Sequence, residues 1–234
     1  MDRHGRRGHR PAPGRGRFQN GRAGRFRRRR RGVDQERARR RFLKKARPVY
    51  PIAFDPVRVR AVVVGRGRGA VRRIAGLEAA GISHIRVFAP EPDAEIRAKA
   101  GANLVARLPE AQDLEGANLV LVAGLEDGAA QAIAHAARGA GIAVNVEDRP
   151  AWCDFHLPAT LRRGDLLLTA STGGRSPGLA RALRNHLGRL FGAEWAGRLD
   201  ALAEARQGWR AEGADPRAVA RRTQEWIDRE GWFG

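Results

Sequence analysis

A short valine run that leads into a glycine-rich turn constrains this chain more than any other feature. Residues Val62–Val64 are followed by Gly65, Gly67 and Ala70 in the spacing G-x-G-x-x-A, and a helical pattern comes next. Between a strand and a helix, this spacing is typical of a dinucleotide-binding crossover. Gly65 lets the chain turn tightly, Gly67 lets the backbone approach a pyrophosphate, and Ala70 lets the helix pack close to the sheet. Free N–H groups at the helix start then attract phosphate charge.

Strand and helix patterns alternate through the following hundred residues. We expect strands at 57–64, 84–88, near 104, at 119–122 and at 142–146, and helices at 70–80, 94–100 and 127–138. This alternation predicts right-handed crossovers and a parallel, Rossmann-like sheet of the α/β class. Ligands of such sheets sit beyond the carboxyl ends of the strands. Those ends fall here at Gly65, Glu91, Gly124 and Asp148.

The pattern changes after Pro150. We expect strands at 154–158 and 166–171 joined by an Arg-Arg-Gly link, then a helix at 178–191 that Ser176 caps with Pro177 in its first turn. Residues 194–234 predict two amphipathic helices divided near 213–216. The chain is therefore expected to comprise an Arg-rich tail at 1–48, a Rossmann-like domain at 49–150, a small α+β region at 151–192 and a helical region at 193–234.

The positive charge is concentrated at the N-terminus. Residues 1–47 hold 20 Lys and Arg against 3 Asp and Glu, whereas the remainder holds 25 against 22. A segment so charged and so poor in apolar residues cannot bury enough surface to offset its ordering entropy, and we expect it to be disordered. Two interpretations stay open for it: a solvated extension, or an electrostatic contact with nucleic acid.

The absence of targeting signals and the cysteine content bear on the cellular location of the protein. The tail has no apolar signal-peptide core, and no run approaches membrane-spanning length. The single cysteine, Cys153, excludes an intrachain disulfide and a thiolate metal cluster within one chain. We therefore expect a cytoplasmic protein without a membrane segment or a protein-held metal.

Four stretches between Tyr50 and Leu190 resemble one known family. They are Tyr50-Pro-Ile with Phe54-Asp55; Val64-Gly-Arg-Gly-Arg-Gly-Ala with Arg72-Arg73; Val144-Asn-Val-Glu-Asp148 with Cys153-Asp-Phe-His-Leu-Pro-Ala159; and Ser171-Thr-Gly-Gly-Arg-Ser-Pro-Gly-Leu-Ala-Arg181. The last two are the most specific. The family is that of precorrin-2 dehydrogenases, which form the N-terminal module of siroheme synthases and also occur as stand-alone precorrin-2 dehydrogenase/sirohydrochlorin ferrochelatases.

The resemblance implies an activity and an assembly. It implies NAD-dependent oxidation of precorrin-2 to sirohydrochlorin in siroheme biosynthesis, in some members followed by insertion of ferrous iron. It also implies a homodimer in which residues 151–192 serve dimerisation and substrate binding. The metal is then held by the pyrroles of the substrate, so no metal site in the protein is expected.

The resemblance also assigns site residues. Asp148 matches the catalytic aspartate. The positions matched to cofactor contacts are Gly65, Gly67, Arg68, Gly69, Pro90 and Glu91. The positions assigned beside the tetrapyrrole are Ser171, Thr172, Gly173 and Gly174. His156, close to Asp148 in the sequence, is a further candidate for substrate binding. Arg162, Arg163, Arg175 and Arg181 are candidates for binding the substrate carboxylates, with solvation as the alternative for each.

The residues themselves leave other interpretations open. Asp148 lies at a strand end beyond a dinucleotide site, where a base for the departing proton is needed, but it also fits a loop cap before Pro150. His156 also fits a structural role. Arg66 and Gly69 depart from the family's usual Gly-Gly-Gly-x-Val turn, and Arg66 either pairs with phosphate or crowds it. A family member that binds tetrapyrrole or NAD without turnover, and a nucleic-acid-binding protein acting through residues 1–47, remain alternative hypotheses.

Overall fold

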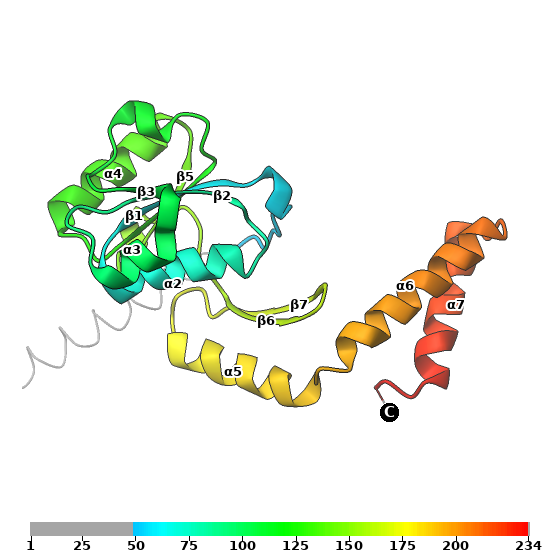
Figure 1. Cartoon of the computed structure of the whole chain (residues 1–234). Coiled ribbons are helices and arrows are strands. Elements are labelled where there is room, and N and C mark those ends of the chain that lie inside the picture. The colour runs from blue at the N-terminus through cyan, green and yellow to red at the C-terminus, as the bar shows by residue number, and fades with distance from the viewer. Residues whose placement is uncertain (1–48, 234) are drawn as a thin grey trace, which may run out of the picture. The chain divides into compact units, whose positions relative to one another are not determined.

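A parallel five-stranded sheet forms the centre of the Rossmann-like part of the chain (Figure 1). The computed structural model describes residues 49–233, so the predictions for the tail lie outside the described residues. The strands are β1 (Arg60–Gly65), β2 (His84–Phe88), β3 (Leu104–Val105), β4 (Leu119–Ala123) and β5 (Ala143–Val146). The crossover helices are α2 (Gly67–Glu78), α3 (Ala94–Ala100) and α4 (Asp127–Gly139).

The strand order is β3-β2-β1-β4-β5, which confirms the predicted fold class. Val62 of β1 pairs with Arg86 of β2 on one side and with Val120 of β4 on the other. The chain thus moves outward from β1 in both directions, so the two crossovers diverge at the carboxyl ends of β1 and β4. In open parallel sheets this divergence creates the ligand-binding crevice.

Helices cover both faces of the sheet because the strand residues alternate in direction. Ala61 and Val63 pack with α2 and α3 in one buried cluster. Val62 and Val64 pack with α4 in the other. Strands buried on both faces read as continuous apolar runs, which explains the uninterrupted valines of β1.

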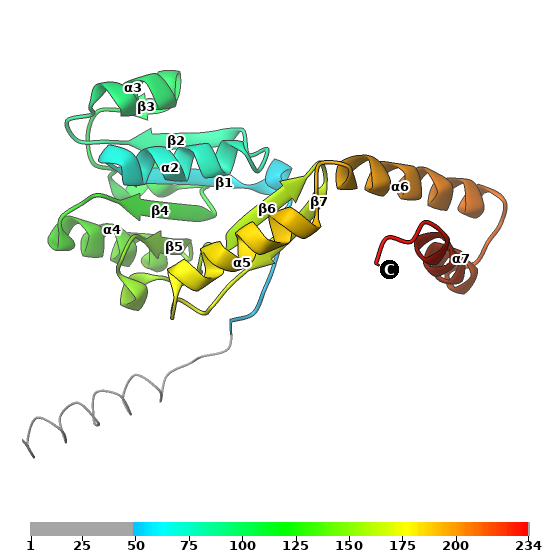
Figure 2. The same cartoon turned by 90° about the horizontal axis from the view of Figure 1, so that it is seen from below.

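A second group of elements follows the sheet (Figure 2). Its members are the antiparallel strands β6 (Ala159–Arg163) and β7 (Leu166–Ala170), then α5 (Pro177–Leu190), α6 (Trp195–Ala211) and α7 (Pro216–Arg229). Helix α5 lies against the β6–β7 ribbon. An aromatic cluster follows α5: the ring of Trp195 lies tilted against Phe191 and edge-to-face with Trp232, with centroid distances of 4.8 Å and 5.6 Å.

Three short 3-10 turns connect to the sheet, one of them at its rim, the edge formed by the carboxyl ends of the strands. Pro150–Trp152 forms η4 directly after the β5 rim, and Ala111–Leu114 forms η3 before β4. Gly101–Asn103 forms η2 between α3 and β3. Among the helices of residues 49–233, none combines the length and apolar character needed to cross a membrane.

Three boundary predictions were wrong. Residues 154–158 are not a strand, because the Asp154 carboxylate accepts hydrogen bonds from Arg138 Nε (2.9 Å) and from the Val144 N–H (3.0 Å), which tie this segment to α4 and β5. The prediction that Arg-Arg-Gly links the two strands is also wrong. Both arginines belong to β6, and the turn consists of Gly164 and Asp165. The first strand begins at Arg60, three residues later than predicted, because Asp55 caps a 3-10 turn, η1 (Pro56–Arg58), that precedes it.

Candidate functional site

The glycine turn after β1 packs backbone against backbone with the turn after β4. Gly65 has φ +148°, and a Cβ added there would lie 2.8 Å from the Ala123 carbonyl carbon and closer still to its oxygen. The Arg66 N–H donates to the same oxygen at 3.2 Å. Gly124, with φ +66°, has equally little room against the Arg66 carbonyl. Only glycine fits Gly65 and Gly124, because both backbones are left-handed and each meets the other loop.

The space above this turn is open, and the start of α2 faces it. Gly67 has φ +65°, and an added Cβ would meet no atom of residues 49–233 within 4 Å. The N-cap residue of α2, Arg66, makes no side-chain hydrogen bond to the N–H groups at the helix start. Uncapped N–H groups at a helix start attract phosphate, and a bare glycine allows close approach. The residues present therefore fit the pyrophosphate of a dinucleotide.

Arg66 extends along the β4–α4 loop. Its Nε donates to the Gly124 carbonyl at 3.2 Å, and its guanidinium lies 3.8 Å from the Glu126 carboxylate. The sequence left open whether this side chain pairs with phosphate or crowds it. In the structure the guanidinium bridges the two turns at the divergence of the crossovers.

Pro90 and Glu91 follow β2 at the same edge of the sheet. Glu91 is exposed and has φ 51°, one of two non-glycine residues with positive φ in residues 49–233. Such a backbone is uncommon outside glycine, asparagine and aspartate. The structure thus places an acidic side chain at the end of the strand next to β1, as the sequence pattern requires for a ribose contact.

Asp148 is the other non-glycine residue with positive φ, at 57°. It is exposed at the carboxyl end of β5, between Glu147 and Arg149. Glu147 accepts a hydrogen bond from Arg72 Nη2 of α2 at 3.0 Å. This connection between the β5 rim and the cofactor helix was not predicted from the sequence.

Arg73 adds a half-buried positive charge near the same rim. Burial lowers the pKa of the Arg73 guanidinium from its ordinary value, while the nearby Glu147 carboxylate acts in the opposite direction. Its Nε is buried and has no hydrogen-bond partner within residues 49–233. Two cationic side chains of α2, Arg72 and Arg73, therefore accompany the two carboxylates at the end of β5.

The rim loop closes on the Cys153 thiol. Cys153 Sγ lies 3.2 Å from the Val146 carbonyl oxygen and 3.3 Å from the Arg149 carbonyl oxygen, the two acceptors that share its single S–H, and it accepts from the Val146 N–H at 3.3 Å. Burial raises the pKa of this thiol. A raised thiol pKa disfavours the nucleophilic thiolate, and the contacts of Cys153 with Val146 and Arg149 assign it a structural role in this loop. Asn145, buried in β5, donates to the Phe155 carbonyl at 2.8 Å and fixes the next segment.

The Ser171–Gly174 turn precedes α5 and adjoins His156. Ser171 Oγ accepts from the Gly173 N–H at 3.2 Å, and Thr172 Oγ1 accepts from the Ser176 N–H at 3.0 Å. A Cβ added to Gly174 would lie 3.9 Å from His156 Cε1. The structure therefore brings His156 to the turn, although the two are far apart in the sequence.

Arg163 is not available for a substrate carboxylate. Its Nε donates to the carbonyls of Phe191 (2.9 Å) and Gly192 (3.0 Å), just after the C-terminus of α5. This guanidinium supplies donors to carbonyls that have no partner within the helix. Arg162, Arg175 and Arg181 are exposed.

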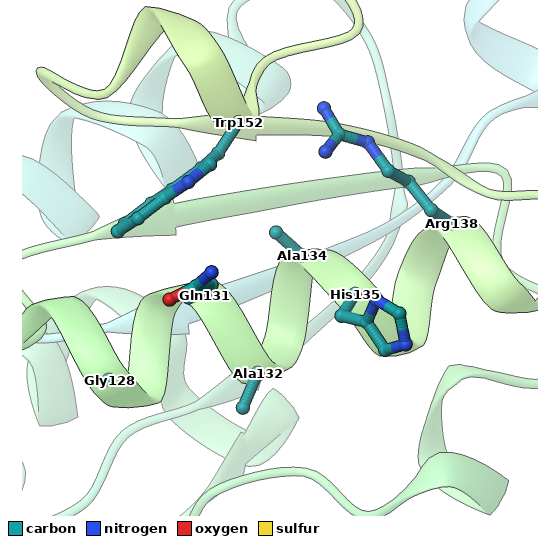
Figure 3. A pocket seen from close by; sticks show the side chains of 7 residues that line it. All are labelled: Gly128, Gln131, Ala132, Ala134, His135, Arg138 and Trp152. Carbon is teal, nitrogen blue, oxygen red and sulfur yellow. The ribbon is translucent and has the colours of Figure 1, made fainter.

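A pocket of about 410 Å³ lies elsewhere, along α4 (Figure 3). Gln131 and His135 project from the helix and Trp152 comes from η4; Gly128, Ala132, Ala134 and Arg138 complete the lining. It contains none of the predicted site residues. Across residues 49–233, no group of three or more His, Cys, Asp or Glu side chains is placed to hold a metal ion.

Comparisons with known proteins agree with this arrangement. Residues 52–159 match a protein family described as "Putative NAD(P)-binding". The siroheme synthase of Thiobacillus denitrificans is 37% identical over 156 residues, which cover 65% of this chain and 32% of that protein. The siroheme synthase of Methylococcus capsulatus is 36% identical over 160 residues, covering 67% and 34%. The chain thus spans about a third of the length of these relatives.

The solved structure of SirC, a precorrin-2 dehydrogenase, extends the match. It superposes with a TM-score of 0.62 and 25% sequence identity over 80% of this chain and 93% of that one. The coverage extends past the NAD(P)-binding region, so the match is not limited to the common Rossmann-like sheet. The chain is thus similar to SirC over most of both chains, and to the siroheme synthases over about a third of their length.

Proposed function

We propose that this protein oxidises precorrin-2 to sirohydrochlorin with NAD as the oxidant. The observation that carries the proposal is the position of Asp148 at the carboxyl end of β5, on the same edge of the sheet as a turn that fits a dinucleotide. The similarity to the siroheme synthases and to SirC, a precorrin-2 dehydrogenase, supports the choice of substrate. The step removes a hydride and a proton from the tetrapyrrole, so an acceptor for each is required.

The chain's own residues divide the work in this proposal. The pyrophosphate is held at the start of α2 by Gly65, Gly67, Arg68 and Gly69. The adenosine ribose is bound by Glu91. NAD, when bound, accepts the hydride. The Asp148 carboxylate takes the proton that leaves with it. His156 and the Ser171–Gly174 turn contact the substrate from the region that follows the sheet.

Binding without turnover is the main competing function, and one pair of measurements separates the two. We expect titration calorimetry to detect NAD binding, and we expect anaerobic incubation with NAD to convert precorrin-2. Binding of NAD or sirohydrochlorin with no conversion would select the competing function. Residues 1–47 lie outside the described structure, and their contact with nucleic acid stays a separate prediction.

Iron insertion is tested by the same reaction with ferrous iron added. In this proposal iron is a second substrate, held by the pyrrole nitrogens of sirohydrochlorin. The absorption spectrum of siroheme would then replace that of sirohydrochlorin at a rate that depends on protein concentration. Equal rates with and without protein would remove chelation from the proposal.

Glu91 is expected to select NAD over NADP. Its carboxylate can accept hydrogen bonds from a ribose, whereas the 2′-phosphate of NADP would be repelled by it. Replacing Glu91 with alanine should weaken NAD binding about tenfold and leave NADP binding unchanged or stronger. Calorimetric titration with both cofactors measures this. Glu115→Ala is the matched control, since Glu115 is an exposed acid before β4, at the opposite edge of the sheet. Unchanged selectivity in Glu91→Ala would contradict the assignment.

We infer that the protein acts as a homodimer formed through α5 and the β6–β7 ribbon. Only Ala180 of α5 is buried, while Leu179, Leu183 and Leu190 are 53%, 43% and 58% exposed. Their spacing places the three leucines on one face of the helix. A contiguous apolar face of this kind is typical of a surface that another subunit covers.

A single charge tests the dimer. Replacing Leu183 with glutamate places a carboxylate in the centre of that face, and we expect the mass from light scattering to fall by half. Leu108→Glu is the control, because Leu108 is an exposed leucine outside α5 and the ribbon. A wild-type protein that is monomeric at high concentration would refute the inference.

A further inference from the structure

Glu147 extends from the β5 rim to the first turns of α2. Its side chain is 23% exposed, and Oε1 accepts from Arg72 Nη2 at 3.0 Å. The carboxylate fills the volume beside Gly69: a Cβ added to Gly69 would lie 3.1 Å from Glu147 Cδ and closer still to Oε2. The family resemblance leads us to expect valine at position 69. This chain has glycine there, and the Glu147 carboxylate occupies the space that a larger side chain would need.

Arg149 makes a corresponding contact with α4 on the other face of the sheet. Its Nε donates to Asp127 Oδ1 at 2.9 Å, and Asp127 is the first residue of α4. Its Nη1 also donates to the Asp148 carbonyl at 3.3 Å. The Arg149 side chain is 41% exposed and that of Asp127 is 67% exposed.

The two ion pairs hold Asp148 from both sides. Residues i and i+2 of an extended strand point to the same face of a sheet. Glu147 and Arg149 instead contact helices on opposite faces, α2 and α4, because the positive φ of Asp148 between them interrupts the extended chain. The backbone continues this restraint, since the Glu147 N–H donates to the Val122 carbonyl at 2.9 Å and the Arg149 N–H donates to the Val146 carbonyl at 3.3 Å. Between them, Asp148 keeps the uncommon φ of 57°.

We propose that Glu147 and Arg149 are positioning residues that fix the Asp148 carboxylate for proton transfer, and that Gly69 provides the space that Glu147 needs. The inference rests on the proposed function, because it assigns Asp148 the proton. A misplaced catalytic group costs far more in rate than in folding free energy. Exposed ion pairs contribute little to the free energy of folding. We therefore expect the loss of either ion pair to lower turnover rather than stability.

The first test compares two glutamates that form ion pairs on the same face of the sheet. Glu78, at the end of α2, pairs with Lys99 of α3 far along the helix from the rim. We expect Glu147→Ala to lower kcat about tenfold while the Kd for NAD stays within about twofold, and Glu78→Ala to leave both unchanged. Glu147→Gln still accepts from Arg72 and should restore most of the turnover. Wild-type kcat in Glu147→Ala, or a parallel loss of NAD binding, would overturn the proposal.

Two readouts do not depend on turnover. Hydrogen exchange at the Arg149 amide should accelerate in Glu147→Ala and not in Glu78→Ala, because the rim loses its connection to α2. Gly69→Ala should lower Tm less in the Glu147→Ala background than in the wild type; the contact of the new Cβ with Ala123, at 3.1 Å, is common to both backgrounds. Equal exchange rates, or equal losses of Tm, would overturn the proposal. A wild-type protein without turnover would refute the proposed function instead, and these two readouts would still decide the placement of Glu147.

Discussion

Replacing Asp148 with asparagine is expected to reduce the turnover of precorrin-2 by about 10²- to 10⁴-fold, the usual contribution of a general base. Asparagine suits this test because it tolerates positive φ almost as well as aspartate, and φ is 57° here. The substitution therefore removes the base and leaves the backbone in place. Single-turnover kinetics with saturating NAD measure the loss.

The control for Asp148 is another exposed aspartate in a turn. Asp165, in the β6–β7 turn, can be replaced with asparagine without touching the β5 rim. We expect Asp165→Asn to turn over like the wild type and both variants to bind NAD with unchanged Kd. Wild-type turnover in Asp148→Asn would show that the aspartate only caps the loop before Pro150.

Replacing Gly65 with alanine is expected to destabilise the protein by about 3 kcal/mol or more. The new methyl group would overlap the Ala123 carbonyl, which is backbone and is fixed by the pairing of β1 with β4. The left-handed φ of +148° adds strain. Urea unfolding gives the free energy, and loss of soluble protein at 37 °C is a second expected sign.

Gly67 separates stability from cofactor binding at the same turn. Gly67→Ala adds a methyl group in open space, so only the cost of positive φ applies, about 1 kcal/mol. The methyl group projects where the pyrophosphate is proposed to lie, and the Kd for NAD should rise about tenfold. Tight NAD binding by Gly67→Ala would place the cofactor elsewhere. A Gly65→Ala protein of normal stability would contradict the contact with β4.

The sheet and its rim were predictable because both depend on local signals. Continuous valines indicate a strand buried on both faces, and the glycine spacing marks where β1 ends and α2 begins. Once the sheet is parallel, Gly65, Glu91 and Asp148 must lie at one edge, and the structure has all three there. The roles assigned to them stay proposals.

The contacts of the rim were not predictable for a physical reason. Glu147 and Arg72 are 75 residues apart, and their hydrogen bond exists only because β5 and α2 meet across β4. No periodicity carries that information. Two features of the sequence lie at this contact, although neither predicts it: the Glu147-Asp148 pair at a strand end and the unexpected glycine at position 69.

The error at 154–158 has a related cause. Phe155 and Leu157 alternate with polar residues, which predicts a strand. The hydrogen bonds that the Asp154 carboxylate accepts from Arg138 and Val144, and the one that Asn145 donates to the Phe155 carbonyl, instead hold the segment against β5 as a loop. Tertiary hydrogen bonds outweighed the local pattern, and β6 starts at Ala159.

The proposed reaction forms two products, NADH and sirohydrochlorin, in equal amounts. Purified protein should be mixed anaerobically with precorrin-2 and NAD, and the absorbance of NADH and of sirohydrochlorin followed together. We predict that both appear at the same rate, one NADH for each sirohydrochlorin, and that Asp148→Asn suppresses both. Sirohydrochlorin formed without NADH, or NAD bound while precorrin-2 stays unconverted, would contradict the account.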